Sequence, residues 1–303
     1  MDKTGVTFLN GHSPRRNSLG LIAFPNSLDG RTNFCRFFSK TPDDRWFHTD
    51  FDFQAKAVSA IIDEHSGYKA WWVLGKNGEV AELVIGGPTN LEQIVGAGLN
   101  RTQPYGYLES LKNIRNTLYA CGYGRQVYRR DSSGWTSIAD SILTRDKATG
   151  FFDIDGLDHD NLYAVGWKGE IYFYDGSRWL KDDSPTTAHL SSVKCLDDGT
   201  VFISGDRGIV LKGSFNHWQL IEAEGFTGNW YGMESFNGDI YLAGNAEIAR
   251  IEDDTIVAVK VAEEPITTHR LNAKEGLLWS IGESDLYVFD GERWMEVKHP
   301  DNR

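Results

Sequence analysis

The chain has 303 residues, 40% of them hydrophobic and 13% aromatic, and its 31 Lys and Arg against 43 Asp and Glu give a formal net charge of −12. This acidity argues against nucleic acid or an anionic membrane as the main partner, because both attract basic surfaces. It is compatible with a basic protein partner, and equally with a role in solubility alone.

The N-terminus and the cysteines bear on the cellular compartment. Residues 1–10 lack the basic-then-apolar pattern of a signal peptide, and no apolar run approaches the length of a membrane span. Cys35, Cys121 and Cys195 fall in the expected strands of three different units, so we expect reduced thiols in the core. Together these features predict a cytoplasmic protein.

The chain repeats one pattern: an apolar run that ends at glycine, a short turn, and a second β-rich run. Residues 19–24, 34–38 and 44–46 form a degenerate first copy, and six clearer copies follow. The intervals between their pivot glycines are 47, 44, 39, 39 and 38 residues, the glycines being Gly75, Gly122, Gly166, Gly205, Gly244 and Gly282. Repetition at this period indicates units that cover their apolar faces with their neighbours.

Two units show how strands are expected within a copy. In the second, residues 55–64 are the best helical candidate in the chain, but they are equally compatible with an inner strand over 57–62. In the fourth, β-rich runs over 151–155, 162–165, 170–174 and 178–181 are separated by short turns. Asp175 and Gly176 give a type I′ hairpin signal in the last of these turns. Four short strands in roughly 40–50 residues correspond to one propeller blade.

A tryptophan closes most of the units. It follows the pivot glycine by 13 residues at Trp135, Trp179 and Trp218 and by 12 at Trp294, whereas the sixth copy has Val257 at the expected position. A large ring in the outermost strand can cover the sheet edge and pack between neighbouring blades. We therefore interpret this tryptophan as structural.

These units resemble the WD40/YVTN/BNR-like propellers, especially bacterial repeats of the form D-x-L/V-Y-A-V-G…G-x-I-x-x-Y-D-G-x-x-W. Residues 160–179 match this form closely and residues 285–294 match its second half. The leading serine of a sialidase-type Asp box and the Gly-His and Trp-Asp pairs of WD40 repeats are absent. The repeat and the resemblance predict an all-β, seven-bladed β-propeller of four-stranded antiparallel blades. It would be a single domain over 1–303, with approximate blades 1–50, 51–97, 98–140, 141–184, 185–223, 224–262 and 263–303.

The sequence offers no convincing catalytic or metal-binding set. The sialidase chemistry that a BNR-like propeller implies requires three converging arginines, but only Arg270 lies in an expected inner strand, with Arg115 just past another. The eight histidines show no paired metal-ligand spacing. The acidic run of Asp153, Asp155, Asp158 and Asp160 ends in turn formers and lacks the closing glutamate of a calcium loop. We therefore predict no catalytic residues, no metal and no cofactor.

Aromatic and basic residues gather where the chain enters the inner strands and at the turns between second and third strands. In a propeller these segments share one rim, and Tyr, Trp and Arg dominate protein–protein hot spots. Residues 96–107 form the longest such insertion. The same aromatics could instead cap the core, but Trp167 lies in a hairpin turn with few expected core partners. The predicted partner-binding residues are Tyr105, Tyr107, Phe151, Trp167, Trp230, Tyr231, His269 and Arg270.

The function that these observations favour is protein binding without enzymatic activity. The most concrete form is a monomeric, cytoplasmic immunity (antitoxin) protein that binds a bacterial toxin, with a basic toxin domain as the partner, through one rim. One alternative is a carbohydrate-binding, lectin-like propeller that uses Trp167, Trp230 and Tyr231 as stacking platforms. Another is a hydrolase or lyase with its site in the central funnel.

Overall fold

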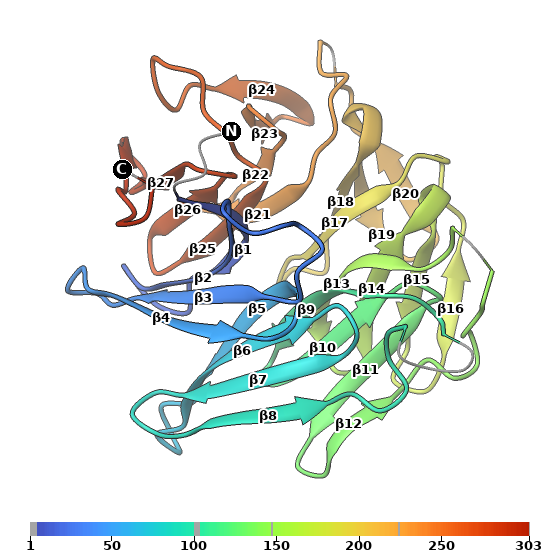
Figure 1. Cartoon of the computed structure of the whole chain (residues 1–303). Coiled ribbons are helices and arrows are strands. Elements are labelled where there is room, and N and C mark those ends of the chain that lie inside the picture. The colour runs from blue at the N-terminus through green and yellow to red at the C-terminus, as the bar shows by residue number, and fades with distance from the viewer. Residues whose placement is uncertain (1–4, 100–103, 147, 224, 303) are drawn as a thin grey trace.

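The computed structural model describes residues 5–99, 104–146, 148–223 and 225–302, and it shows an all-β ring of seven sheets around a central channel (Figure 1). Each sheet has four antiparallel strands paired in sequence order, so the predicted fold class is confirmed. Among the described residues, no helix has the length and apolar character needed to span a membrane.

The sheets are numbered as blades I to VII in chain order. Blade I contains β1 (Val6–His12), β2 (Leu19–Pro25), β3 (Cys35–Lys40) and β4 (Trp46–Phe51). Blade II contains β5 (Ala55–Ile62), β6 (Lys69–Gly75), β7 (Glu79–Val84) and β8 (Thr89–Gln93). Blade III contains β9 (Leu108–Ile114), β10 (Thr117–Gly122), β11 (Gln126–Asp131) and β12 (Gly134–Ser137). The sequence of the second unit was compatible with either a helix or a strand at its start, and β5 shows that this segment is a strand.

Blade IV contains β13 (Phe151–Asp158), β14 (Asn161–Gly166), β15 (Ile171–Tyr174) and β16 (Trp179–Asp182). Blade V contains β17 (Leu190–Cys195), β18 (Val201–Gly205), β19 (Val210–Ser214) and β20 (His217–Leu220). Blade VI contains β21 (Gly232–Phe236), β22 (Asp239–Ala243), β23 (Ile248–Glu252) and β24 (Thr255–Val259). Blade VII contains β25 (Arg270–Lys274), β26 (Leu277–Ile281), β27 (Leu286–Phe289) and β28 (Trp294–Glu296). Two 3-10 turns, η1 (Trp167–Gly169) and η2 (Asp206–Gly208), join the second and third strands of blades IV and V.

The first strand of each blade lines the channel, and the chain runs along these strands from one rim to the other. We call the rim at which the first strands begin the N-rim, and the opposite one the C-rim. The N-rim carries the segments that precede the first strands and the turns between second and third strands. The C-rim carries the remaining turns. Because the strands are paired into rigid sheets, loops on either rim can vary without disturbing the fold.

The hydrophobic core lies between the blades rather than within any one of them. Trp72 and Leu74 of blade II, for example, share a cluster with Leu108 and Leu111 of blade III. The recurring tryptophans belong to these seams: Trp179 Nε1 donates to the Ile138 carbonyl of the preceding blade at 3.0 Å. Trp135 and Trp218 donate in the same way to Glu92 and Asp182 of the blades before them. The structural interpretation of the repeat tryptophan is therefore confirmed.

Two local expectations from the repeat are wrong. Strand pairing places Ile256, opposite Ile251, at the position that Trp218 holds opposite Gly213, because the turn of blade VI has the same length as that of blade V. Ile256 is buried in the seam with blade V while Val257 is exposed, so counting from the pivot glycine selected the wrong residue. The turn at Asp175 is not type I′, because only Gly176 of its two central residues has a positive φ.

Blades I and VII are built from opposite ends of the chain, so the ring closes without a shared sheet. After β28 the C-terminal tail crosses to blade I, where His299 lies among three aromatic rings. Its ring centroid is 5.0 Å from that of Phe8, 4.4 Å from Phe38 and 4.6 Å from Trp46. His299 is 2% exposed, so the tail forms part of the seam between the two terminal blades.

Candidate functional site

All eight residues predicted to bind a partner lie on or beneath the N-rim. Each belongs to a segment that leads into a first strand, begins such a strand, or lies in the turn η1. Residues 100–103 of the insertion over 96–107 fall outside the described residues, but Tyr105 and Tyr107 are described. The predicted residues therefore share the N-rim, although they contribute to its surface unequally.

Phe151 and Trp230 lie beneath the rim, in the core. Both are 0% exposed. The Phe151 ring lies 5.5 Å from that of Tyr172, and the Trp230 ring lies 5.5 Å from that of Phe226. Their side chains therefore stabilise the blades and present no surface to a partner, which corrects their expected role. The residues that follow them, Phe152 and Tyr231, are partly exposed instead.

An aromatic cluster spans the N-rim from blade III to blade V. Trp167 is its centre, with ring centroids 4.5 Å from His189, 5.5 Å from Phe152 and 5.8 Å from Tyr123. The backbone N–H of Lys168, at the tip of η1 with φ 52°, donates to His189 Nδ1 at 3.0 Å. The four rings come from three blades, so they form one surface that neither a single repeat nor a single loop could supply.

Two cation–aromatic pairs extend this surface toward blade II. The guanidinium of Arg145 lies 4.5 Å from the ring centroid of Tyr105 and also donates to its hydroxyl at 3.2 Å. The Lys76 ammonium lies 4.9 Å from the ring centroid of Tyr107. Such pairs hold both partners in place and present a mixed apolar and cationic face. These features are typical of hot-spot residues at protein interfaces.

A salt bridge supports the cluster from below. Arg125 Nη2 lies 2.6 Å from Glu170 Oε1, and the other oxygen of Glu170 accepts the backbone N–H of Gly150 at 3.1 Å. Arg125 also lies 5.2 Å from the ring centroid of Tyr172. Because the pair is largely buried between blades III and IV, it fixes the relative position of the two blades that carry Tyr123 and Trp167.

His269, Arg270 and Tyr231 meet at the mouth of the channel. Arg270 Nη1 donates to the Tyr231 carbonyl at 2.7 Å, and His269 Nε2 lies 3.3 Å from the Leu9 carbonyl. Burial, with a smaller effect from the Arg270 charge, lowers the pKa of His269 to about 4, so this imidazole is neutral at pH 7. Burial also lowers the pKa of Arg270, although the charges of Asp153 and Glu109 partly offset it.

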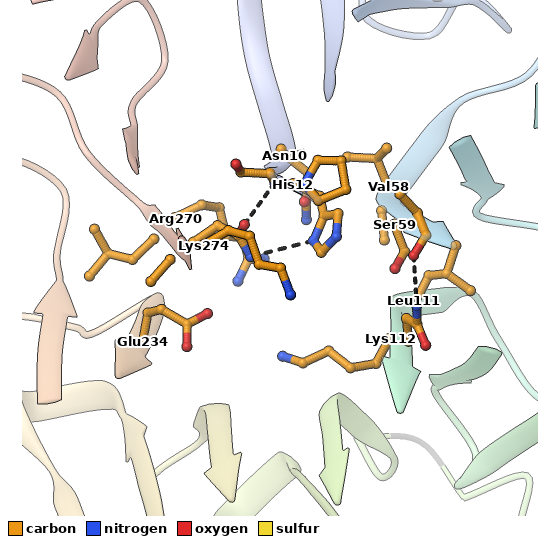
Figure 2. Close-up of a pocket in the computed structure, with 18 of the residues that line it drawn as sticks. Asn10, His12, Val58, Ser59, Leu111, Lys112, Glu234, Arg270 and Lys274 are labelled. Carbon is orange, nitrogen blue, oxygen red and sulfur yellow. Dashed lines mark hydrogen bonds between the residues drawn. The ribbon is translucent and has the colours of Figure 1, made fainter. Parts of the chain in front are cut away.

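Behind the mouth, the channel forms a cavity of about 590 Å³ lined by the first strands of all seven blades. Figure 2 shows Lys112, Lys274 and Glu234 extending into this space from three different blades. Lys112 Nζ lies 3.7 Å from Asp153, and Lys194 Nζ lies 2.5 Å from Glu234. Lys112 and Lys194 thus pair with carboxylates of the neighbouring blades.

Burial and pairing oppose each other in this network. Burial alone would lower the pKa of Lys194, but the charges of Glu234 and Asp155 outweigh it and raise that pKa. Burial raises the pKa of Asp155, with Lys112 and Lys194 acting in the opposite direction. Both lysines remain protonated at pH 7, and the network ties together four blades.

The structure also places the aspartate run and the cysteines. Asp153 accepts bonds from Ser192 Oγ and the Val193 N–H of blade V, whereas Asp158 accepts the Asp160 N–H within its own turn. Asp153 therefore stabilises the contact between two blades, whereas Asp158 stabilises a turn. Within the described ranges, no three His, Cys, Asp or Glu side chains are grouped to hold a metal ion. Cys35, Cys121 and Cys195 are all free thiols.

Comparison with known proteins gives one relative by sequence. No protein-family model matches the chain. The immune protein Tsi7 of Pseudomonas aeruginosa PAO1 is 32% identical over 245 residues, which cover 79% of this chain and 79% of that protein. The similarity thus extends over most of the ring.

Solved structures with low identity share the architecture. YCF48 from Cyanidioschyzon merolae superposes with a TM-score of 0.68 at 13% identity, covering 99% of this chain and 97% of that one. A YCF48 bound to D1 peptide has a TM-score of 0.62 at 14% identity, covering 98% and 95%. Saccharomyces cerevisiae Sqt1 has a TM-score of 0.62 at 11% identity, covering 98% and 86%. These likenesses concern the propeller fold alone.

Proposed function

The chain belongs to the family of the immune protein Tsi7, and we propose that it is an immunity protein that binds a bacterial toxin and blocks its action. The observation that carries this proposal is the 32% identity to that protein over 79% of both chains. Propellers that share only the architecture with this chain fall at 11–14% identity. The resemblance to the immune protein therefore exceeds what the fold alone requires.

We place the toxin on the N-rim. The cluster around Trp167 and the pairs at Tyr105 and Tyr107 provide aromatic and cationic contacts on rigid strands, which cost little side-chain entropy on binding. Tyr231, His269 and Arg270 extend this surface to the channel mouth. Binding there would act by occluding the toxin and would need no chemistry from the propeller, so we propose a non-enzymatic role.

The partner, the assembly and the compartment follow from charge and cysteine chemistry. A net charge of −12 would steer a basic toxin domain toward the propeller and raise the association rate. Three free thiols on three different blades suit the reducing cytoplasm, where a toxin delivered into the cell would act. We propose a monomeric propeller that binds one toxin domain.

The structure does not favour the carbohydrate-binding alternative, because two of its three expected stacking residues are covered by other side chains. It used Trp167, Trp230 and Tyr231 as stacking platforms, but Trp230 is 0% exposed and Trp167 packs against three neighbouring rings. A sugar would need an open ring face for stacking. The described N-rim is better suited to a broad protein contact.

Co-expression tests the proposal directly. The polypeptide encoded beside this gene in its native genome would be expressed in a sensitive host, with and without the propeller. We expect growth inhibition by the neighbour alone, full rescue by the propeller, and a stoichiometric complex on size-exclusion chromatography. Rescue without a complex, or no effect of the propeller on a toxic neighbour, would overturn the proposal.

A further inference from the structure

Arg270 is a partly buried cation of the channel that has no carboxylate partner among the described residues. Lys56, Lys112 and Lys194 each lie within 4 Å of an acidic oxygen, on Glu109, Asp153 and Glu234 respectively. Over the described part of the chain, no carboxylate comes within that distance of the Arg270 guanidinium. Its Nη1 donates to the Tyr231 carbonyl, and its buried Nε has no hydrogen-bond partner. A guanidinium with a buried, unbonded nitrogen is costly to the free protein.

The protein itself shows what such a guanidinium can bind. Arg36 donates from Nε to one oxygen of Asp50 at 2.6 Å and from Nη2 to the other at 2.8 Å. This two-pronged contact is the strongest that arginine makes with a carboxylate. In Arg270 the corresponding Nε and Nη2 have no acceptor among the described residues, since its one hydrogen bond uses Nη1. A carboxylate is therefore an acceptor that would complete the bonding of this guanidinium.

A second cavity, of about 490 Å³, opens beside Arg270 at the N-rim. Leu9, Phe24 and Phe34 of blade I supply its apolar lining, and Lys56 and Glu109 also line it. Leu9 is 38% exposed, so this lining is open to a ligand. The cavity thus combines an apolar surface with a cation.

The wall of this cavity is preformed. The turn between β2 and β3 spans residues 26–34, whereas the corresponding turns of blades IV and V are three-residue 3-10 turns. Gln54 Nε2 holds this long turn against blade II by donating to the carbonyls of Gly30 at 3.0 Å and Thr32 at 2.9 Å. A preformed cavity loses little conformational entropy when a ligand binds.

The charges of the cavity select the ligand. Lys56 and Glu109 pair with each other at 2.9 Å, which leaves the Arg270 cation without a directly paired carboxylate among the described residues. A single negative charge therefore completes the site, and an apolar group next to that charge would contact Leu9, Phe24 and Phe34.

We propose that Arg270 receives one carboxylate of the toxin, while an adjacent apolar side chain of the toxin occupies the cavity against Leu9, Phe24 and Phe34. This inference rests on the proposed function, whose binding surface it narrows to a defined contact. The carboxylate is supplied either by an Asp or Glu side chain or by the C-terminus of the toxin. Either source supplies the carboxylate partner that Arg270 lacks in the free propeller.

The first test measures the affinity of the purified neighbour-encoded toxin for the wild-type propeller, Arg270→Gln and Arg270→Lys. We expect Arg270→Gln to weaken binding by at least about 30-fold, because it leaves the toxin carboxylate buried without its cation. Arg270→Lys should recover only part of this loss, since lysine keeps the positive charge but cannot make the two parallel hydrogen bonds of a guanidinium. Arg178→Gln, on the C-rim, removes the same charge from an exposed site and should leave the affinity unchanged within about 3-fold.

The second test identifies the carboxylate by double-mutant cycles between Arg270→Gln and toxin variants. One arm replaces each toxin Asp and Glu by its amide, and the other extends the toxin C-terminus by Gly-Ser so that its terminal carboxylate is displaced. One variant in one arm should be non-additive with Arg270→Gln. Additivity in every cycle, or wild-type affinity of Arg270→Gln, overturns the contact. If Trp167→Ala still weakens binding in that case, the proposed function stands without it, whereas absence of any wild-type complex overturns both.

Discussion

Asn302 and Val6, 296 positions apart, are joined by two hydrogen bonds: the Val6 N–H donates to Asn302 Oδ1 at 2.8 Å, and Asn302 Nδ2 donates to the Val6 carbonyl at 2.9 Å. One side-chain amide thus pairs with the first strand of the ring as a neighbouring strand would. Since blades I and VII share no sheet, this pair helps to fasten the seam between them.

Asn302→Ala should therefore destabilise the whole ring. Both main-chain groups of Val6 would lose their partner in a partly buried position, at a cost of about 1–3 kcal/mol in the free energy of unfolding. Chemical denaturation of the variant and the wild type measures this cost. Lys298→Ala, on the same tail but 71% exposed, should change the free energy by less than about 0.5 kcal/mol. Equal stability of Asn302→Ala and wild type would mean that the tail does not close the ring.

His299 makes the same seam sensitive to acid. Burial lowers the pKa of His299 from 6.5 to about 4, with the nearby Asp301 charge acting weakly in the opposite direction. Between these values the unfolded chain binds a proton that the folded chain does not, so stability falls as pH drops from 6.5 toward 4 and is fully retained above 6.5. The full contribution is roughly 3 kcal/mol for this residue.

His299→Phe should remove that dependence. Nε2 of His299 has no hydrogen-bond partner and Nδ1 accepts only the Asp301 N–H at 3.2 Å, so a phenyl ring between Phe38 and Trp46 should be tolerated at the loss of that one bond. Unfolding free energies at pH 5.0 and 7.5 give the measurement: the wild type should lose more stability on acidification than the variant. His12 and His269, whose pKa values burial lowers to about 3 and about 4, titrate in both proteins and cancel in the comparison. Parallel pH profiles would contradict the assignment.

The repeat tryptophans should differ in how much their indole N–H groups contribute. Trp218 Nε1 donates at 2.8 Å to Asp182, a carboxylate that is 2% exposed. Trp135 Nε1 donates at 3.0 Å to Glu92, which Arg130 also binds with two nitrogens at 2.6 and 3.1 Å. Removing the indole from Asp182 therefore leaves a poorly solvated charge with fewer donors.

We expect Trp218→Phe to lower the free energy of unfolding by about 1–3 kcal/mol, and Trp135→Phe to lower it by less. The two substitutions are matched in the atoms they remove, so thermal and urea unfolding of the pair isolate the role of the acceptor. A larger loss for Trp135→Phe would show that ring packing, rather than the hydrogen bond, decides the effect.

The sequence was sufficient to predict the architecture because a turn glycine, and in most units a closing tryptophan, recurs at intervals of about one blade. The sequence was less informative about which of two adjacent residues faces the core, because a shift of one position along a strand moves a side chain to the opposite face. Phe151 and Phe152 are adjacent, yet only the second reaches the rim, and the same holds for Trp230 and Tyr231. Successive side chains of an extended chain point in opposite directions, so an aromatic pair at a strand start predicts one core and one surface ring without telling which.

Contacts between distant segments were beyond sequence reasoning. Arg270 was singled out as the one arginine of the inner strands, but its lack of a carboxylate partner depends on six other strands that reach the channel. The tail that carries His299 and Asn302 has no repeat signature. It contacts Val6 only because the ring closes after seven blades, which brings blade VII next to blade I.

The rim assignment makes a prediction about binding. Trp167→Ala and Tyr105→Ala should each weaken the toxin complex by at least about 10-fold, because aromatic hot-spot residues contribute more than about 1.4 kcal/mol. Isothermal titration gives the affinity, and the melting temperature of each free variant shows whether the fold is intact. Arg178→Ala on the C-rim serves as the control. If both aromatic variants bind as the wild type does and the control does not, the toxin binds the opposite rim.

The charge network of the channel should be structural, and a double-mutant cycle can show it. Asp153 is 8% exposed and accepts bonds from Ser110 Oγ at 2.8 Å and the Val193 N–H at 3.2 Å, with Lys112 Nζ at 3.7 Å. Asp153→Ala should cost about 3–5 kcal/mol, because the partner charge of Lys112 stays in the channel without its nearest carboxylate.

Replacing the lysine as well should restore part of this stability. In Asp153→Ala/Lys112→Met, neither charge remains, and the methionine side chain fills a similar volume. We expect the double variant to be more stable than Asp153→Ala alone, with a coupling of at least about 1 kcal/mol by urea unfolding. Additive losses would mean that Asp153 acts through its bonds to Ser110 and Val193 and not through Lys112. In that case the neighbouring Asp155, whose charge also acts on the pKa of Lys112, would be the carboxylate that compensates it.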